Sequence, residues 1–506
     1  MTPDKNYDSA FCGSLPIHNI NLVQPYGVLL VLDGASLQIV QASENAHLVF
    51  NLPVTELAGT PLQAHVGEAA VNLLTAHFDK ATSNKIPFTL TVQDKQYLAL
   101  AHAKTGYILV EIELNAYETA SLQPFVSVFQ ELKYSMLAIE EAPTTAAMCT
   151  VAARELKKIS GFDKVMIYHF DENWNGTVVA EEMEPAMESY MGFTFPASDI
   201  PRQARDLYQR NAYRLIPSRE YTPVKLYPVI NPVTHAFVDL SDCNMRAVAA
   251  VHIEYLKNMG VMASMSTRIM YGDKLWGLIA CHHREAKYLS FEMCAVFELL
   301  SGIMSAKVTA LNNKEQSLFN ALLNESHARF IEQVYNSQGV TAAFAAGGAH
   351  LLSLFNATGA ALIQQGKVQL YGQTPGAEEL EELVFWLNAR KLKNTWSETH
   401  LSSVFDTAHK YTGHASGLLA IPLNSNGDDY LLLFRPEVVR TVNWGGNPDE
   451  AIQFEGNTGK YHPRHSFKLW QQTFRAISLP WHDEELRMAE YLRSFIYEFN
   501  TRQVLP

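Results

Sequence analysis

The 506-residue sequence contains only 5 cysteines and no Cys-x-x-Cys pair. A scaffold built on disulfides would need more cysteines in a chain of this length, and structural zinc sites and dithiol redox centres need paired ones. Positive charge is also scarce, because 39 lysines and arginines stand against 52 aspartates and glutamates, a formal net charge of −13. We therefore expect a protein of the reducing cytoplasm that does not bind nucleic acid through a broad basic surface.

Long uninterrupted apolar runs are missing as well. Residues 1–7 are polar and lack the apolar core of a secretory signal. The strongest candidate for a membrane span is the segment 340–363, but it is interrupted by Gly347, Gly348, His350, Asn356 and Gly359. We predict a buried helix, a turn and a strand there, and no membrane association.

The length favours about three domains, and 47% hydrophobic with 18% charged residues is typical of globular proteins. The first unit begins with two apolar runs in 27–40 around an Asp33-Gly34 turn, which predicts antiparallel strands. A helix is predicted at 68–80, and further strands at 88–98 and 107–114. This pattern indicates a mixed α+β unit.

The second unit is predicted to start with two helices, 125–139 and 144–159, the latter ended by Gly161. Two hairpins are predicted to follow, 165–170 with 176–181 and 261–268 with 274–282. Between the hairpins, residues 195–251 form a loop-rich insertion with six prolines and a helix near 203–210. Insertions this long in a compact domain usually carry function.

A long helix is predicted from Phe291 to about Gln333, because this segment has no proline and a single glycine. Apolar residues recur every seven positions at Phe297, Met304, Leu311 and Leu318. About 40 helical residues extend about 60 Å, so the helix should bridge domains or pair with another copy. Two stacked shorter helices are the alternative.

A third α+β unit is predicted at 339–479, followed by a helix at 484–499 that has the character of a connector.

Several side chains near the insertion could carry chemistry. Arg205, Arg214 and Arg246 could bind a ligand with carboxylates, or form ion pairs with local acidic residues. The adjacent residues Cys281, His282 and His283 do not favour a metal site, because neighbouring strand residues point to opposite faces.

Three motifs in the second unit resemble the chromophore-binding GAF domain of phytochromes. They are Pro196-Ala197-Ser198-Asp199-Ile200-Pro201, His252–Val261 and Leu275–His283. Two further pairs of motifs resemble the PAS domain and the tongue of the PHY domain of that family. They are Gln24-Pro25-Tyr26-Gly27 with Ala42-Ser43-Glu44-Asn45, and Trp444-Gly445-Gly446 with Pro463-Arg464-His465-Ser466-Phe467.

The resemblance implies an α+β fold of three tandem domains, each with a central antiparallel sheet and flanking helices, joined by a long helical spine. The implied bounds are 1–117 for an N-terminal extension and PAS domain, 118–310 for GAF and 311–506 for PHY. An N-terminal lasso, or knot, between PAS and GAF is also implied. The implied function is that of a red/far-red photoreceptor that regulates an output domain or response regulator. The chain would form a homodimer through the spine and would not itself be an enzyme.

The implied cofactor is biliverdin IXα, joined by a thioether to Cys12 as in bacterial phytochromes. Relatives that attach the bilin in the GAF domain have a cysteine immediately before the motif histidine, where this chain has Val251.

The resemblance also assigns roles in the site. Asp199 would offer its backbone carbonyl to the pyrrole N–H groups and its carboxylate to Arg464, with Ser466 beside it in the coupling motif. His252 would hold the pyrrole water and a propionate. The resemblance further implies that Arg214 and Arg246 bind one propionate and that Ser264 and Ser266 bind the other. Tyr168, Phe195 and Tyr255 would surround the D ring, with His282 near its carbonyl. The wall around the bilin would be completed by Ile200, Pro201 and Tyr208.

The sequence departs from the family at Ala249-Ala250, where Ser-Pro is common, and at Tyr26, where histidine is usual. The first change removes one hydroxyl that the resemblance places near the propionates. A different class of function, a PAS and GAF sensor of a cyclic nucleotide or of haem with His252 as an iron ligand, stays open, as does a thiol enzyme that uses Cys12 and His252.

Overall fold

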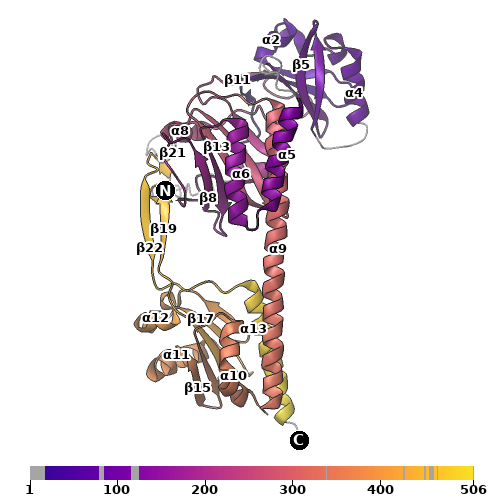
Figure 1. Cartoon of the computed structure of the whole chain (residues 1–506). Helices are drawn as coiled ribbons and strands as arrows, with labels where there is room; N and C mark the ends of the chain where they lie inside the picture. Colours follow the sequence, from indigo (N-terminus) through magenta and orange to yellow (C-terminus); the bar gives the residue numbers. More distant parts are fainter. Residues whose placement is uncertain are drawn as a thin grey trace, which may run out of the picture. The chain divides into compact units, whose positions relative to one another are not determined.

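Figure 1 shows the computed structural model of the chain. The structure describes residues 17–78, 85–114, 125–337, 339–424, 428–448, 452–454, 461–463 and 465–504. The chain divides into two compact units, Met1–Leu311 with Asn443–Trp470 and Asn312–Val442 with Gln471–Pro506. Each unit is built of sheets flanked by helices, which agrees with the α+β prediction.

The first sheet of the first unit is antiparallel throughout, in the order β1-β11-β3-β2-β6-β5-β4. Its strands are β1 (Leu22–Val23), β2 (Gly27–Asp33), β3 (Ile39–Ser43), β4 (Ile86–Val92), β5 (Lys95–Lys104), β6 (Tyr107–Glu113) and β11 (Val224–Tyr227). Its helices are α2 (His47–Phe50), α3 (Val54–Leu57) and α4 (Glu68–Phe78). Apolar residues of these helices and of one sheet face form a single core.

One predicted strand of this sheet is wrong. The segment 88–98 is not one strand but parts of β4 and β5, joined by a turn at Gln93-Asp94. Both turn residues have left-handed backbone angles, φ 46° and 64°. The turn was missed because it contains neither glycine nor proline, the residues that usually mark such turns.

The loop-rich insertion completes the first sheet. Strand β11 pairs with β3, with Leu226 opposite Ser43, and also with β1. A separate apolar cluster joins the second face of this sheet to insertion residues such as Leu240 and Met245. The predicted knot depends on residues before Ile17, which lie outside the described part of the chain, and it stays a prediction.

The second sheet of the first unit has the order β10-β12-β13-β7-β8-β9, continued by β19 and β22. The strands are β7 (Lys164–Phe170), β8 (Gly176–Met183), β9 (Thr194–Phe195), β10 (Tyr213–Ile216), β12 (Ala263–Tyr271), β13 (Lys274–His283), β19 (Arg440–Gly445) and β22 (Leu469–Phe474). The helices are α5 (Phe125–Glu141), α6 (Thr145–Ser160), α7 (Arg202–Arg210), α8 (Ala250–Asn258) and the first part of α9 (Phe291–Asn336), whose residues from Asn312 on belong to the second unit. Both predicted hairpins are confirmed.

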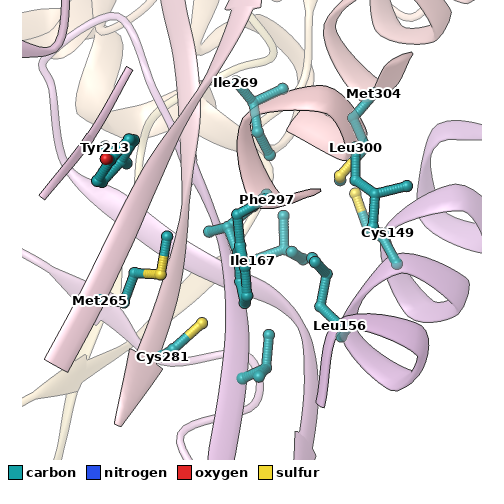
Figure 2. Packing of buried hydrophobic residues seen from close by; sticks show 14 of the residues in the cluster. Cys149, Leu156, Ile167, Tyr213, Met265, Ile269, Cys281, Phe297, Leu300 and Met304 are labelled. Carbon is teal, nitrogen blue, oxygen red and sulfur yellow. The ribbon is translucent and has the colours of Figure 1, made fainter. Parts of the chain in front are cut away.

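One face of the second sheet packs on α5, α6 and α9, and Figure 2 shows this core. Met265 and Ile167 point from the strands toward Phe297 of α9. Helix α6 ends at Gly161 as predicted, where the glycine has a left-handed φ of 62°. At the other end, the Thr144 hydroxyl caps the helix by accepting from Ala147 N–H. The opposite face of the sheet is left for other contacts.

Helix α9 is a single helix of 46 residues, so the alternative of two stacked helices is wrong. By length and composition it is apolar enough to cross a membrane. However, its residues Phe297, Leu300, Met304 and Val308 are completely buried in the core of the second sheet. Packing in that core accounts for this part of its apolar character.

The second unit contains a sheet in the order β15-β14-β18-β17-β16. Its strands are β14 (Gly359–Gln364), β15 (Lys367–Gly372), β16 (Trp396–Glu398), β17 (Gly417–Pro422) and β18 (Tyr430–Arg435), and its helices are α10 (Val340–Leu354), α11 (Ala377–Arg390), α12 (Thr412–Ala415) and α13 (Asp483–Val504). The segment 340–363 is a helix followed by a turn and a strand, as predicted. The predicted terminal helix is α13, which is longer than expected at both ends.

Candidate functional site

The second sheet of the first unit gathers polar residues on the face opposite the core of Figure 2. Arg214 of β10 lies opposite Ser266 of β12, and Ser264 of β12 lies opposite His282 of β13. Residues paired across antiparallel strands share a face, and so do residues two apart in one strand. These predicted site residues therefore lie on one face, and we call them the polar row.

Two arginines lie close together at the edge of the polar row. Arg214 donates from Nη1 to the backbone oxygen of Asn244 at 3.2 Å and from Nη2 to that of Arg246. Arg246 donates from Nη1 to the backbone oxygen of Ile17, while its buried Nε has no hydrogen-bond partner among the described residues. In the part of the chain that the structure describes, neither arginine has an ion pair with a carboxylate. Among the described residues, the sequence alternative of local ion pairs therefore finds no support for these two arginines.

The two guanidinium groups repel each other. Burial, and then the charge of Arg214, lower the pKa of Arg246 to about 9. A half-buried and a buried cation that have no carboxylate partner among the described residues form a site that an anionic ligand would stabilise.

Two histidines face the same region in their neutral form. Burial, followed by the charge of Arg214, lowers the pKa of His252 on α8 to about 4. Burial and the charge of Lys164 lower the pKa of His282 to about 3. The His252 ring stacks on that of Tyr255, with centroids 5.9 Å apart and an interplanar angle of 11°. Near pH 7 both imidazoles are uncharged and can donate and accept hydrogen bonds.

Hydroxyl groups link the polar row to the insertion. The Tyr208 hydroxyl of α7 lies 2.5 Å from Ser266 Oγ. The Tyr255 hydroxyl of α8 donates to Asp199 Oδ2 at 3.0 Å. The structure thus brings the Asp199 motif and the His252 motif together, as the resemblance implies.

The loop before α7 is held by hydrogen bonds from the Arg205 side chain to the loop backbone. Pro201 precedes the first turn of α7, and the Arg205 guanidinium donates from Nη1 to the backbone oxygens of Ile200 and Ala197. Arg205 also lies over the Trp174 ring, 4.6 Å from its centroid. Of the three candidate arginines, Arg205 therefore shapes the loop, while Arg214 and Arg246 form the cationic pair.

An aromatic layer borders the polar row. Tyr168 and Phe195 have ring centroids 5.6 Å apart, and Tyr190 meets Phe195 edge to face at 5.7 Å. Tyr255 meets Phe467 edge to face at 5.1 Å. All five rings belong to one apolar cluster that includes strands β7 and β13. Tyr190 was missed in the sequence because it lies in a loop with no recognisable motif.

A buried ion pair beside this layer was also missed. Lys164 Nζ lies 3.0 Å from Glu181 Oε1, and both side chains are almost fully buried. The ammonium group lies 3.8 Å from the centroid of the Tyr190 ring. The sequence signal for this ion pair was the lysine that begins the largely apolar strand Lys164–Phe170.

The segment that resembles the tongue packs on this layer. Trp444 pairs in parallel with Thr194, and a Cβ atom on Gly445 would lie 2.7 Å from Phe195 Cε1. Ser466 is exposed, and its hydroxyl accepts from Lys468 N–H. The predicted attachment residue Cys12 and the predicted partner of Asp199, Arg464, both lie outside the described residues.

The donor set fits a long, flat ligand with carboxylates. Two cations, two neutral imidazoles and several hydroxyls lie beside aromatic rings, and no described residue supplies an acceptor for the buried Arg246 Nε. These features match a linear tetrapyrrole with propionate groups. Among the described residues, no cluster of three His, Cys, Asp or Glu side chains is arranged to hold a metal ion.

Comparisons with known proteins identify the domains of the chain. Family models match as a PAS fold at residues 12–115, a GAF domain at 145–307 and a phytochrome region at 323–504. Cyanobacterial phytochrome B from Nostoc sp. is 36% identical over 97% of this chain and 66% of its own length, so the chain spans just under two thirds of that relative. A bacteriophytochrome from Xanthomonas campestris pv. campestris is 32% identical over 97% of this chain and 78% of its own length.

A crystal structure of a bacteriophytochrome from the photosynthetic bacterium R. palustris is similar, with a TM-score of 0.83 and 30% identity over 98% of this chain and 100% of that one. The predicted three-domain α+β fold is thereby confirmed. The chain belongs to the phytochrome family, as a photosensory module of PAS, GAF and PHY domains.

Proposed function

We propose that this chain is the light-sensing part of a red/far-red photoreceptor and that it binds biliverdin IXα covalently through Cys12. The observation that carries the proposal is the pair of the half-buried Arg214 and the buried Arg246, which has backbone contacts but no described carboxylate partner. A bilin supplies the photochemistry, the rotation of its D ring about a methine double bond on absorbing light.

The residues of the site would share the work of holding the ligand. Arg214 and Arg246 would bind one propionate, and the hydroxyls of Ser264 and Ser266 the other. The neutral His252 would hold a water molecule or a propionate oxygen, and the Asp199 backbone carbonyl would accept from pyrrole N–H groups.

The aromatic layer would surround the ring that moves. Tyr168, Phe195 and Tyr255 supply flat apolar surface, and His282 lies at the end of β13 on the face of the polar row. Ile200, Pro201 and Tyr208 would complete the wall.

The described cysteines support Cys12 as the attachment residue. Cys149, Cys243, Cys281 and Cys294 are all buried, and burial raises the pKa of each thiol. A buried thiol with a raised pKa forms little thiolate, which is the nucleophile in thioether formation. The residue before His252 is Val251, so attachment at that position is excluded by the sequence.

The signal would leave the site through Asp199 and Tyr255. The Tyr255 hydroxyl donates to Asp199, and the Tyr255 ring packs on Phe467 of the tongue. A change in the rings around the D ring would alter these contacts and favour a different packing of the tongue. Arg464 and Ser466 would take part in this exchange.

Helix α9 would carry the change toward α13 and an output domain such as a histidine kinase. Leu318 and Leu322 of α9 are 58% and 63% exposed. Large apolar side chains on a long helix suit pairing with a second copy, so we propose a homodimer along the spine. A monomeric mass in light scattering at high protein concentration would contradict this part of the proposal.

The deciding experiment is an absorption spectrum of the chain produced together with a biliverdin source, before and after red light. We expect a red band that shifts reversibly, and a zinc-dependent fluorescent band on a denaturing gel that reports covalent bilin. Cys12→Ser should abolish the fluorescent band but keep weaker binding, and Cys149→Ser should keep both. A Soret band would favour the haem sensor, a retained nucleotide the cyclic-nucleotide sensor, and a colourless protein that ignores added biliverdin would refute the proposal.

A further inference from the structure

A carboxylate is buried on the second face of the first sheet, away from the bilin site. Glu111 of β6 is 0% exposed. Its side chain shares this face with Leu109, two residues away, whose surroundings are an apolar cluster of the sheet and the insertion. Burial of a carboxylate in such surroundings is unfavourable unless its oxygens are paired, so its partners indicate what it does.

Glu111 binds the backbone of the insertion. Its Oε2 accepts from Met245 N–H at 2.8 Å, and its Oε1 lies 3.3 Å from His102 Nε2. Burial alone would raise the pKa of Glu111, but the contact with His102, the charge of Lys85 and the Met245 N–H lower it below its usual value. The carboxylate is therefore ionised near pH 7, and its bond to Met245 is charge-assisted.

Met245 is held by the first sheet at two further points. Gln24 N–H donates to the Met245 backbone oxygen at 2.7 Å. Gly27 leaves room for the methionine side chain, since a Cβ atom there would lie 2.1 Å from Met245 Cε. The backbone of residue 245 is thus fixed on both its N–H and its C=O side.

The residues on either side of Met245 hold the bilin-site arginine. The backbone oxygens of Asn244 and Arg246 accept from the Arg214 guanidinium. The Gln24 side chain donates to the backbone oxygens of Leu215 and Arg246, at 3.1 and 3.4 Å. Hydrogen bonds and the backbone of residues 244–246 therefore connect Glu111 and Gln24 to the Arg214 guanidinium and to the backbone of Arg246.

We propose that Glu111 is a positioning residue for propionate recognition. It fixes residues 244–246, and these fix the guanidinium groups of Arg214 and Arg246 where a propionate carboxylate would bind. This inference rests on the proposed function, because it concerns how the bilin site distinguishes its ligand.

The proposal makes the effect of Glu111 depend on the ligand's own charge. If Glu111 acts through the arginines, its loss weakens binding of a ligand with free propionates. Binding of the same tetrapyrrole with esterified propionates changes little, because an ester offers no carboxylate for a guanidinium fork. A merely structural role would weaken both ligands alike.

The test uses the full chain with Cys12→Ser, so that binding is reversible, and titrates biliverdin and biliverdin dimethyl ester. We expect Glu111→Leu to weaken biliverdin binding by about 10-fold to about 100-fold, the range of one to two charge-assisted hydrogen bonds. The ester should change by less than about threefold. Glu111→Gln keeps an acceptor for Met245 N–H and should restore most of the lost affinity.

Glu113→Leu is the matched control. Glu113 lies two residues further along β6 on the same face and is also buried, but its contacts are Tyr288 and the N–H of Phe291. Any change that Glu113→Leu makes in affinity should be the same for both ligands.

Gln24→Met provides a second variant if Glu111→Leu does not fold. It removes both side-chain donors to Leu215 and Arg246 with little change of volume, and should give the same selective loss. Equal losses for both ligands, or no loss for either, would overturn the positioning role. A parent protein that binds neither ligand would instead refute the proposed function.

Discussion

The contact between the tongue and the aromatic layer can be tested with a single methyl group. In Gly445→Ala the added Cβ would lie 2.7 and 2.8 Å from Cε1 and Cζ of Phe195. The Phe195 ring cannot move away freely, because Tyr168 and Tyr190 pack against it at centroid distances of 5.6 and 5.7 Å. The methyl group must therefore displace the tongue or deform the aromatic layer.

Overpacking of this kind costs about 1–3 kcal/mol. A cost of about 2 kcal/mol on tongue docking corresponds to a shift of about 30-fold in the docking equilibrium. The global stability of the first unit should change little, since the core of its second sheet lies on the opposite face.

Amide hydrogen exchange measures the effect directly. We expect exchange at 443–446 and 465–468 to accelerate by about 30-fold, with β7 and β13 unchanged. Phe195→Leu shortens the ring and should remove most of the acceleration when combined with Gly445→Ala. Gly67→Ala is the control, because no atom lies within 4 Å of its added Cβ. Unchanged exchange at 443–446, or equal acceleration throughout the sheet, would refute the assigned contact.

Three further predictions concern other charged side chains. Asp199→Ala removes the acceptor of the Tyr255 hydroxyl and should leave bilin binding intact but impair photoconversion; complete photoconversion in a difference spectrum would contradict the role of Asp199. The buried Glu485 carboxylate lies 2.6 Å from the Arg435 guanidinium, and Arg435→Met removes this charged partner. We expect the free energy of unfolding, measured by urea titration, to fall by roughly 3–5 kcal/mol. A loss under about 1 kcal/mol would argue against a stabilising ion pair. Burial raises the pKa of Glu113 to about 7 from 4.5, so the protonated form favours folding and that contribution is lost as the pH rises toward about 7. In the parent protein this pKa shift lowers the free energy of unfolding by up to about 3 kcal/mol between pH 4 and pH 8. Glu113→Gln should flatten this pH dependence, and an unchanged pH profile of thermal unfolding would disprove the role of Glu113.

Local signals in the sequence were sufficient for many elements. The Thr144 cap and Gly161 fix the ends of α6, and the Gly272-Asp273 turn fixes the hairpin of β12 and β13. These elements follow from interactions between residues close together in the chain, which propensity and turn chemistry describe well.

Contacts between distant segments could not be predicted from such signals. Strand β11 pairs with β3 across more than 180 residues, with Leu226 opposite Ser43. Glu111 accepts from Met245, 134 positions away. No periodicity connects such residues, so the length of the insertion and the motifs of the family resemblance indicated a functional role for it but not its pairing with the first sheet.

The polar row itself was nevertheless present in the strand pattern. In β12, Ser264 and Ser266 alternate with the buried Met265, and in β10 Arg214 lies between the buried residues Tyr213 and Leu215. A shift of one residue in register would turn both serines toward the helices and Met265 toward the ligand. The apolar core shown in Figure 2 therefore does more than stabilise the sheet: because Met265 must face α9, the hydroxyls on either side of it must face the proposed bilin site.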